Sequence, residues 1–237
     1  LRRRHIGEVD QAAKDEHIEE AFDYIAKNKG IRDVLITGGD PLTFSDDRLD
    51  YMLSRLDEMK HIEIKRIGSK MPVTTPMRVT DDLCSMLEKH HPFYMNIQVN
   101  HPREITKDTA RAIDRLTKAG IQMGNQAVLL KGINDDPVTM KVLNHELLKI
   151  RVRPYYIYHC QGTIGIAHFR TPVEKGIEII ENLRGYTTGM AVPDYIIAPS
   201  GYGKTPLAPN YKISEGEGYI TLRNWEGKVY RYENPVC

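Results

Sequence analysis

An α/β fold organised around a parallel sheet is predicted by two features of this 237-residue sequence. First, strand-like and helix-like hydrophobic patterns alternate along almost the whole chain, which is typical of βα repeats. Second, the short apolar strands are followed by polar, glycine-bearing loops. Such loops favour a barrel whose functional site lies at the carboxyl ends of its strands, with a doubly wound sheet as the alternative.

The strands are predicted from short apolar or alternating runs that end at turn residues. The first run is closed by Gly38-Gly39-Asp40 and the second by Gly68-Ser69. In chain order, the predicted strands cover residues 33–37, 62–67, 93–99, 121–130, 153–158 and 195–197. Two further runs, 219–222 and 229–232, surround Glu226-Gly227 and predict a C-terminal hairpin.

The helices are predicted from apolar residues that recur every three or four positions. Ser45, Thr80 and Thr106 precede three of these segments and are suitable N-caps, because a side-chain oxygen can accept a free backbone N–H there. The other helical patterns cover residues 16–29, 137–150 and 172–183.

The composition excludes several classes of protein. Lys and Arg total 33 against 32 Asp and Glu, so the net charge of +1 gives no electrostatic case for a nucleic-acid partner. No apolar run approaches the length of a membrane span. Cys84, Cys160 and Cys237 lack any metal-binding spacing, which predicts a reducing, cytoplasmic setting and no metal ligands within this sequence.

A lysine in a glycine-rich stretch near the C-terminus is the most distinctive candidate residue. Residues 198–206 read Ala-Pro-Ser-Gly-Tyr-Gly-Lys-Thr-Pro and follow a predicted strand. A phosphate-binding P-loop is excluded, because Ala198 stands where that motif needs glycine and Pro206 opposes the helix that must follow. Lys204 is therefore either an exposed loop residue or an amine at a cofactor site.

Considered one at a time, the other polar residues at strand ends fit simpler explanations. Residues 38–41 form an ordinary tight turn, and Gln126 can satisfy hydrogen bonds inside a barrel. Their common position at one end of the predicted barrel is what makes them candidates for a shared site.

Together these segments resemble the lysine 2,3-aminomutase family, whose members use S-adenosylmethionine, a [4Fe–4S] cluster and pyridoxal 5′-phosphate. The matches run nearly from end to end in the same order. They are Arg2-Arg3-Arg4, Thr37-Gly38-Gly39-Asp40, Arg66-Ile67-Gly68-Ser69, Asn100-His101-Pro102, Gly124-Asn125-Gln126, residues 151–158, His168-Phe169-Arg170-Thr171-Pro172 and Gly203-Lys204-Thr205-Pro206.

The resemblance implies a partial (βα)6 TIM-like radical SAM barrel with a short C-terminal β-hairpin extension. In the family, a Cys-x3-Cys-x2-Cys motif binds the iron–sulfur cluster just before three arginines. The match to Arg2-Arg3-Arg4 implies that the first strand and the cluster loop lie before residue 1, so this chain alone is expected to be inactive. Residues 1–190 are expected to form the incomplete barrel core, and residues 191–237 the lysine loop and β extension.

The resemblance also assigns roles to individual residues. Lys204 would be the catalytic lysine that forms an imine with pyridoxal phosphate. Arg2 would bind the substrate α-carboxylate, which suits a guanidinium group. The residues assigned to S-adenosylmethionine are Gly38, Gly39, Asp40, Ser69 and Gln126.

The implied reaction is an isomerisation of an α-amino acid to a β-amino acid. An external reductant supplies the cluster with an electron, a 5′-deoxyadenosyl radical removes hydrogen from the substrate Cβ, and the amino group moves from C2 to C3. The family also implies a homo-oligomer and no membrane partner.

Departures from the lysine enzyme bear on the substrate. Gln161 aligns with one of the two aspartates that bind the lysine side chain there, and Ile197 occupies the place of the other. Asp136 replaces a cysteine of a structural zinc site, which makes zinc doubtful here. The loss of both anions favours glutamate or another substrate without a side-chain cation.

Two alternatives stay open. In the first, Asp194 replaces the missing anions and the substrate is lysine or arginine, free or protein-bound. In the second, from a different class, the chain is an inactive fragment or a module that binds pyridoxal phosphate without radical chemistry.

Overall fold

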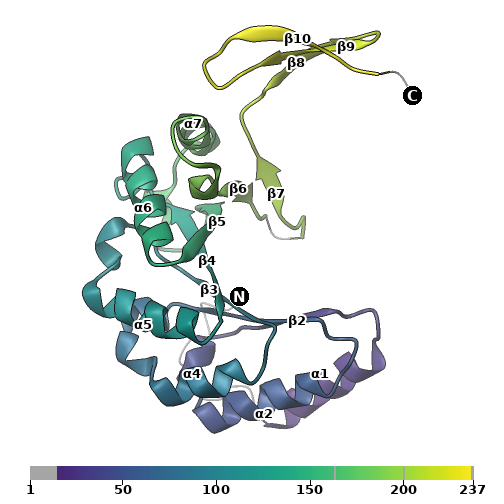
Figure 1. Ribbon diagram of the computed structural model, residues 1–237, viewed down its shortest axis with the longest axis vertical. Helices are drawn as coiled ribbons and strands as arrows, with labels where there is room; N and C mark the ends of the chain where they lie inside the picture. The colour runs from purple at the N-terminus through teal and green to yellow at the C-terminus, as the bar shows by residue number, and fades with distance from the viewer. Residues whose placement is uncertain (1–14, 163, 200, 236–237) are drawn as a thin grey trace. The chain divides into compact units, whose positions relative to one another are not determined.

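The structure is a computed structural model that describes residues 15–162, 164–199 and 201–235 (Figure 1). It divides the chain into two compact units. The first comprises Leu1–Ile97 and Thr106–Gly124, and the second comprises Gln98–Ile105 and Asn125–Cys237. Each unit is described by itself.

The first unit is built from parallel strands joined by helices. Its strands are β1 (Asp33–Ile36), β2 (Ile64–Ser69), β3 (Phe93–Ile97) and the beginning of β4 (Gln122–Leu129). Its helices are α1 (Asp15–Lys27), η3 (Pro41–Thr43), α2 (Asp46–Asp57), α3 (Met71–Thr74), η4 (Pro76–Arg78), α4 (Asp81–Glu88) and α5 (Lys107–Lys118). β1 pairs with β2, and β2 with β3, all in parallel.

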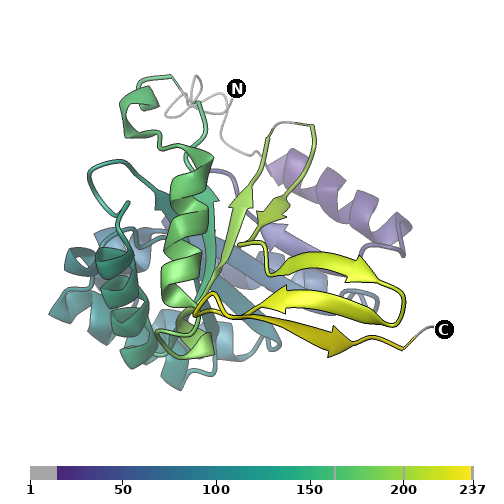
Figure 2. The same cartoon turned by 90° about the horizontal axis from the view of Figure 1, so that it is seen from above.

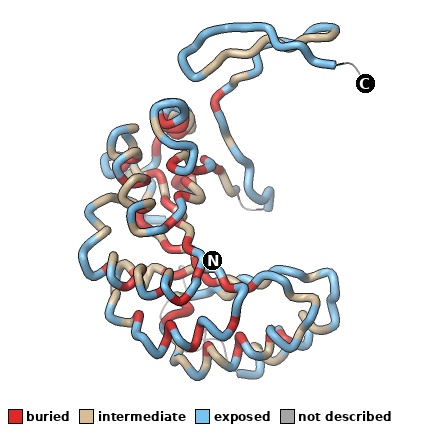
Figure 3. Tube along the Cα trace, in the orientation of Figure 1, coloured by how far each residue is buried: buried red, intermediate tan, exposed pale blue. Residues whose placement is uncertain are grey.

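The helices of the first unit begin at the predicted caps. The side chains of Ser45, Thr80 and Thr106 accept the backbone N–H three residues further on, at the starts of α2, α4 and α5. α2, α4 and α5 each bury the apolar residues of one face, and Figure 3 colours parts of these helices as buried. The buried leucines and isoleucine of these faces are Leu49, Leu53, Leu56, Leu83, Leu87, Ile113 and Leu116.

The second unit continues the βα pattern and ends in a separate small sheet. Its strands are the rest of β4, β5 (Val152–His159), β6 (Asp194–Ile197), β7 (Thr205–Leu207), β8 (Lys212–Gly216), β9 (Tyr219–Arg223) and β10 (Val229–Glu233). Its helices are η5 (Pro102–Glu104), α6 (Pro137–Lys149), η6 (Ala167–Phe169), α7 (Val173–Leu183) and η7 (Gly189–Ala191). β5 pairs with β6 in parallel, whereas β6 pairs with β7 antiparallel.

The strand order distinguishes between a barrel and a doubly wound sheet, the two architectures that the hydrophobic pattern allows. In the main sheet the order is β1-β2-β3-β4-β5-β6-β7, the same as in the chain. A doubly wound sheet requires a reversal of strand order at a switch point, and this sheet has none. The fold is therefore the predicted partial barrel with a small C-terminal antiparallel sheet.

Helix α7 packs against β6 through a glycine and a tyrosine. The Tyr195 ring is buried against Gly176, where any Cβ atom would overlap the ring. The Tyr195 hydroxyl forms a 2.7 Å hydrogen bond with Nδ1 of His159 at the end of β5. Gly176 thus allows an aromatic side chain to connect α7, β5 and β6.

The small sheet has the strand order β10-β9-β8, and its ribbon is seen clearly in Figure 2. The predicted hairpin of β9 and β10 is confirmed, while β7 and β8 were not predicted. Trp225 packs edge-on against Tyr186, with ring centres 5.0 Å apart, and Arg223 forms a 2.5 Å ion pair with Glu181. These contacts attach the small sheet to the end of α7.

Within the described residues, no helix combines the length and apolar character that crossing a bilayer requires.

Candidate functional site

The loop after β1 presents open backbone at two glycines. Among the described residues, nothing lies within 4 Å of a Cβ atom built at Gly38 or Gly39, and Gly38 has φ +153°, a conformation that favours glycine. A ligand can therefore approach the main chain closely at this point. Asp40 ends the loop and caps η3, because its carboxylate accepts the N–H of Leu42 at 3.1 Å.

The Asp40 carboxylate also joins this loop to the one after β2. Oδ1 accepts the hydroxyl of Ser69 at 2.7 Å. Oδ2 accepts the N–H groups of Lys70 and Met71 at 2.7 and 3.2 Å. With the Leu42 bond, four donors occupy the roughly four acceptor positions of a carboxylate. Asp40 therefore fixes the loop, and the glycine backbone is what remains available to a ligand.

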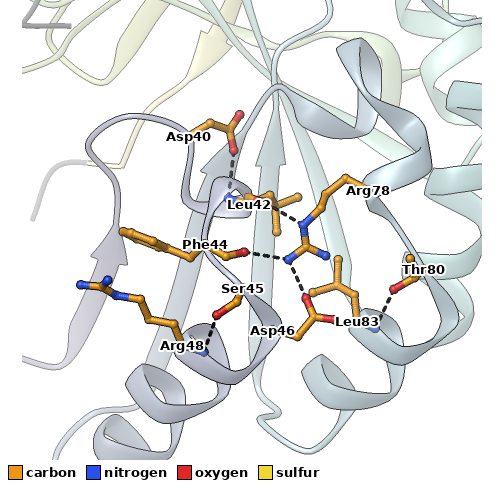
Figure 4. A network of polar contacts seen from close by, with 9 residues as sticks. All are labelled: Asp40, Leu42, Phe44, Ser45, Asp46, Arg48, Arg78, Thr80 and Leu83. Atoms are coloured by element: carbon orange, nitrogen blue, oxygen red, sulfur yellow. Dashed lines mark hydrogen bonds and ion pairs between the residues drawn. The ribbon is translucent and has the colours of Figure 1, made fainter. Parts of the chain in front are cut away.

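Arg78 holds the same loop from its other end (Figure 4). Its Nε donates to the Leu42 carbonyl at 2.8 Å, and Nη2 donates to the Phe44 carbonyl at 3.0 Å. Nη2 also forms a 2.5 Å ion pair with Asp46 at the start of α2. Arg78 was not predicted as a site residue, because nothing in its own segment of the sequence indicates a partner more than thirty residues away.

In the second unit, Gln126 lies on β4 with its side chain half-buried. Its neighbour Asn125 is buried and exchanges two hydrogen bonds, of 2.7 and 3.0 Å, with the backbone of Val99. Since side chains alternate along a strand, Gln126 points to the opposite face of the sheet from Asn125.

Lys204 lies on the loop that joins β6 to β7. Because Ile197 pairs with Thr205, residues 198–204 form the connection of an antiparallel hairpin. Gly201 and Gly203 have φ of +83° and +72°, which only glycine adopts readily. Lys204 itself is exposed, immediately before β7.

The Lys204 side chain reaches back over two tyrosines of β5. Its Nζ lies 4.8 Å from the ring centre of Tyr156 and 5.8 Å from that of Tyr158. Tyr156 pairs in register with Asp194 at the start of β6. A hydrogen bond with Tyr155, then burial and the charges of Tyr155, Tyr158 and Asp194, raise the pKa of Tyr156 to about 12. Tyr156 is therefore a neutral phenol whose strand partner is Asp194 and whose ring contacts Lys204.

Gln161 supports the lysine loop directly. Its side-chain amide donates a hydrogen bond to the carbonyl of Ala198, the first residue of the loop. One N–H and the amide oxygen of Gln161 remain for other partners. Gln161 thus contacts the loop that carries Lys204, and Asp194 is the strand partner of Tyr156, whose ring lies under the Lys204 amine.

The predicted site residues fall into two sets. Gly38, Gly39, Asp40 and Ser69 belong to the first unit, and Gln126, Gln161, Asp194 and Lys204 to the second. Arg2 lies outside the described residues.

Other chemically notable residues have structural roles. Asp136 caps α6: it accepts the N–H of Thr139 at 2.8 Å, and its hydrogen bonds with Thr139 lower its pKa. Cys84 and Cys160 are free and buried, and burial raises the pKa of Cys84 to about 11. Among the described residues, no group of three or more His, Cys, Asp or Glu is arranged to hold a metal ion.

Two family models match this chain. The model of the radical SAM superfamily matches residues 3–141, which is more than half of the sequence. A model described as lysine-2,3-aminomutase matches residues 180–236, the part that contains the Lys204 hairpin and the small sheet.

Curated relatives with similar sequences include two kinds of aminomutase. A glutamate 2,3-aminomutase of Clostridioides difficile is 53% identical over 98% of this chain and 56% of its own length. L-lysine 2,3-aminomutases of Acetoanaerobium sticklandii and Clostridium subterminale are 52% and 50% identical, each over 99% of this chain and 57% of their own length. The chain thus spans a little more than half the length of these relatives.

A solved structure supports the fold. The structure described as "Native anSMEcpe with bound AdoMet" superposes with a TM-score of 0.55 at 10% identity, covering 72% of this chain and 50% of that one. At this identity the likeness concerns the fold alone.

Proposed function

Because the chain belongs to the radical SAM superfamily and, within it, to the lysine 2,3-aminomutase family, we propose that its protein is an amino-acid 2,3-aminomutase. The protein would move the amino group of its substrate from C2 to C3. The observation that carries the proposal is the Lys204 hairpin: an exposed primary amine on an open glycine loop, within the segment that matches the aminomutase model.

The family implies S-adenosylmethionine and an iron–sulfur cluster. The open backbone at Gly38 and Gly39 fits the methionyl amino group, with Asp40 and Ser69 keeping the loop in place. Gln126 would bind on the carboxylate side of the same cofactor.

Pyridoxal phosphate would bind at Lys204, whose exposed amine can react with an aldehyde. The open space around Gly201 and Gly203 leaves room for a planar cofactor beside the loop. Bound together, the cofactors supply a carbon radical that removes hydrogen from the substrate and an aldehyde that carries the migrating nitrogen. The protein's own task is to hold the substrate, through Arg2 at its α-carboxylate, and to exclude competing reactions.

For the substrate, we favour glutamate or another amino acid without a side-chain cation. Gln161 and Ile197 stand where the lysine enzyme has two aspartates, and the second N–H of Gln161 can donate to a carboxylate. A buried ammonium that lacks its anionic partner costs about 3–5 kcal/mol, a factor of roughly several hundred to several thousand in preference.

Asp194 favours the second candidate substrate, lysine. Its carboxylate lies beside Tyr156, which also contacts Lys204, so a side-chain cation could find an anion there. A carboxylate at this position would repel glutamate.

The test is a comparison of kcat/KM for glutamate and lysine in the whole protein. It needs anaerobic conditions, a reconstituted cluster, S-adenosylmethionine, pyridoxal phosphate and a reductant, with β-amino acids identified by NMR. We expect glutamate to be preferred, and Gln161→Asp to shift the preference toward lysine incompletely. Equal or better turnover of lysine would refute the glutamate assignment, and Asp194→Asn should then abolish the lysine preference.

The same assay separates the alternative from another class. A protein that links pyridoxal phosphate to Lys204 but forms no 5′-deoxyadenosine under these conditions would be a binding module without radical chemistry.

A further inference from the structure

The amine of Lys204 lies over the aromatic rings of two tyrosines, Tyr156 and Tyr158. Tyr156 and Tyr158 are two positions apart on β5, so both side chains lie on the same face of the sheet. Their rings meet edge to face, with centres 5.7 Å apart and planes at 73°. The Nζ of Lys204 lies within 6 Å of both ring centres, which is the range of a cation–π contact.

The nearer ring is held in place by its own neighbours. The ring of Tyr155 lies 3.8 Å from that of Tyr156, centre to centre, with the two planes at 30°. Tyr156 is also half-buried and pairs with Asp194 across the strands. The Tyr156 ring is therefore a fixed surface, whereas the Lys204 chain above it is long and exposed.

A cation–π contact differs from an ion pair in what it permits. Lys175, for example, is 2.6 Å from a carboxylate oxygen of Glu178, an arrangement that favours the charged amine at a single position. An exposed ring face attracts the amine more weakly and over a wider area. Such a surface restricts the conformations of a flexible side chain, yet its amine can still dissociate from the ring.

We infer that Tyr156 and Tyr158 are positioning residues for Lys204, forming a shelf on which its amine rests whenever it is not bonded to pyridoxal phosphate. This inference rests on the proposed function, since it concerns the lysine that would carry the cofactor. The rings confine a side chain that otherwise has many rotamers, and the contact is given up when the amine reacts.

The consequence can be measured as cofactor affinity. Loss of one exposed cation–π contact corresponds to a factor of roughly two to five in binding. Because the contact is made only by the free amine, it stabilises the unlinked protein, so Tyr156→Leu and Tyr158→Leu should each strengthen the borohydride-reducible link to pyridoxal phosphate by about that factor. The effect should be larger at Tyr156, whose ring lies closer to Nζ.

The experiment uses the whole protein and two readouts. The first is the dissociation constant of pyridoxal phosphate, from absorbance and from reducible linkage at Lys204 located by peptide mass spectrometry. The second needs no cofactor: with 13Cε-labelled lysine, the Lys204 ε-CH2 signal should be shifted upfield by the ring current of Tyr156. Tyr156→Phe and Tyr158→Phe keep the rings, and Tyr232→Leu, an exposed tyrosine on β10, is the matched control.

The expected result is loss of the upfield shift and tighter linkage in Tyr156→Leu, with the values of the unmutated protein in Tyr156→Phe and in Tyr232→Leu. A Lys204 signal without ring-current shift in the unmutated protein would overturn the inference. Unchanged cofactor affinity in Tyr156→Leu would also overturn it, while leaving the proposed function standing. If pyridoxal phosphate forms no link to Lys204 in the unmutated protein, both are wrong.

Discussion

The loop at Asp40 and the loop at Lys204 are held in opposite ways. Asp40 accepts hydrogen bonds from Leu42, Ser69, Lys70 and Met71, so the loop after β1 is joined to the loop after β2. Among the described residues, the loop that carries Lys204 is held at its base by the pairing of β6 with β7, and beyond it by a side-chain hydrogen bond from Gln161 and by ring faces under the lysine amine.

The difference matches two kinds of chemistry. A loop that recognises a ligand through its backbone must keep its N–H and C=O groups in place, which many short hydrogen bonds achieve. A lysine that makes and breaks a covalent bond must be near its target yet free to move aside. The four predictions below test this contrast, beginning with the largest effect.

Replacing Lys204 should have the largest effect. In the whole protein, Lys204→Ala should abolish turnover and the borohydride-reducible link, because no other group on the hairpin supplies an amine to the aldehyde. Binding of S-adenosylmethionine, measured by calorimetry, should be largely unchanged. Lys204→Arg keeps the charge but cannot form a normal imine, so it should be inactive as well. A reduced cofactor found on another lysine would refute the assignment.

Replacing Asp40 should have the next largest effect. Asp40→Ala removes the carboxylate that accepts four hydrogen bonds in these two loops, and we expect the free energy of unfolding to fall by about 2–4 kcal/mol. Asp40→Asn should be nearly as harmful, because an amide offers one acceptor oxygen where two are used. S-adenosylmethionine affinity should fall roughly tenfold or more in both variants.

The matched control for Asp40 is Asp47→Asn, an exposed aspartate in the first turn of α2. Its loss should cost well under 1 kcal/mol, the scale of an exposed charge near a helix N-terminus. Normal cofactor affinity and stability in Asp40→Ala would show that the loop does not depend on this carboxylate.

Replacing Gln161 by leucine should have a moderate effect that is confined to the hairpin. The variant loses one neutral hydrogen bond, worth about 1 kcal/mol, so linkage of pyridoxal phosphate should weaken roughly fivefold. Amide hydrogen exchange in residues 201–205 should accelerate by a similar factor, while exchange around Asp40 stays the same. Gln122→Leu, an exposed change on β4, serves as control. Unchanged exchange in the hairpin would show that the Gln161–Ala198 bond does not hold the loop.

Acid should have the smallest effect, through His159 at the end of β5. Burial, together with the charge of Arg170, lowers the pKa of His159 from its ordinary value of 6.5. The unfolded chain therefore takes up a proton at a pH where the folded protein does not. As pH falls below about 6.5, the free energy of unfolding should fall by at most ~1.4 kcal/mol per pH unit.

His159→Gln should flatten this dependence in urea titrations between about pH 7 and pH 5, because it removes the titrating ring. The exposed His17→Gln should not. If the free energy of unfolding depends equally on pH in both variants, His159 is not the group that causes this dependence.

Local patterns in the sequence predict most of the barrel. Apolar spacing and the caps at Ser45, Thr80 and Thr106 locate the helices to within a few residues, because both are interactions between near neighbours in the chain. Strand β8 escaped prediction since all of its residues are exposed, so no alternation of burial appears in its sequence. Strand β7 contains Pro206, which is unfavourable in strands and tolerated here at the end of the main sheet.

The resemblance predicts the candidate site residues one by one. It does not predict the contacts that hold these residues in place. Spacing cannot show that Ser69 binds Asp40, that Arg78 holds the carbonyl of Leu42, or that Lys204 lies over Tyr156. These partners are about thirty or more positions apart, and only the folded sheet brings them together.

The contact between Gly176 and Tyr195 links two positions for any future change of sequence. In most helices, alanine in place of glycine stabilises by about 1 kcal/mol. At position 176 the added methyl group would occupy the space of the Tyr195 ring, so the usual improvement becomes a steric clash. A smaller residue at 195 would relieve it but would remove the hydrogen bond to His159. Neither position can therefore be substituted independently of the other. A homologue with a larger residue at one of them is expected to carry a compensating change at the other.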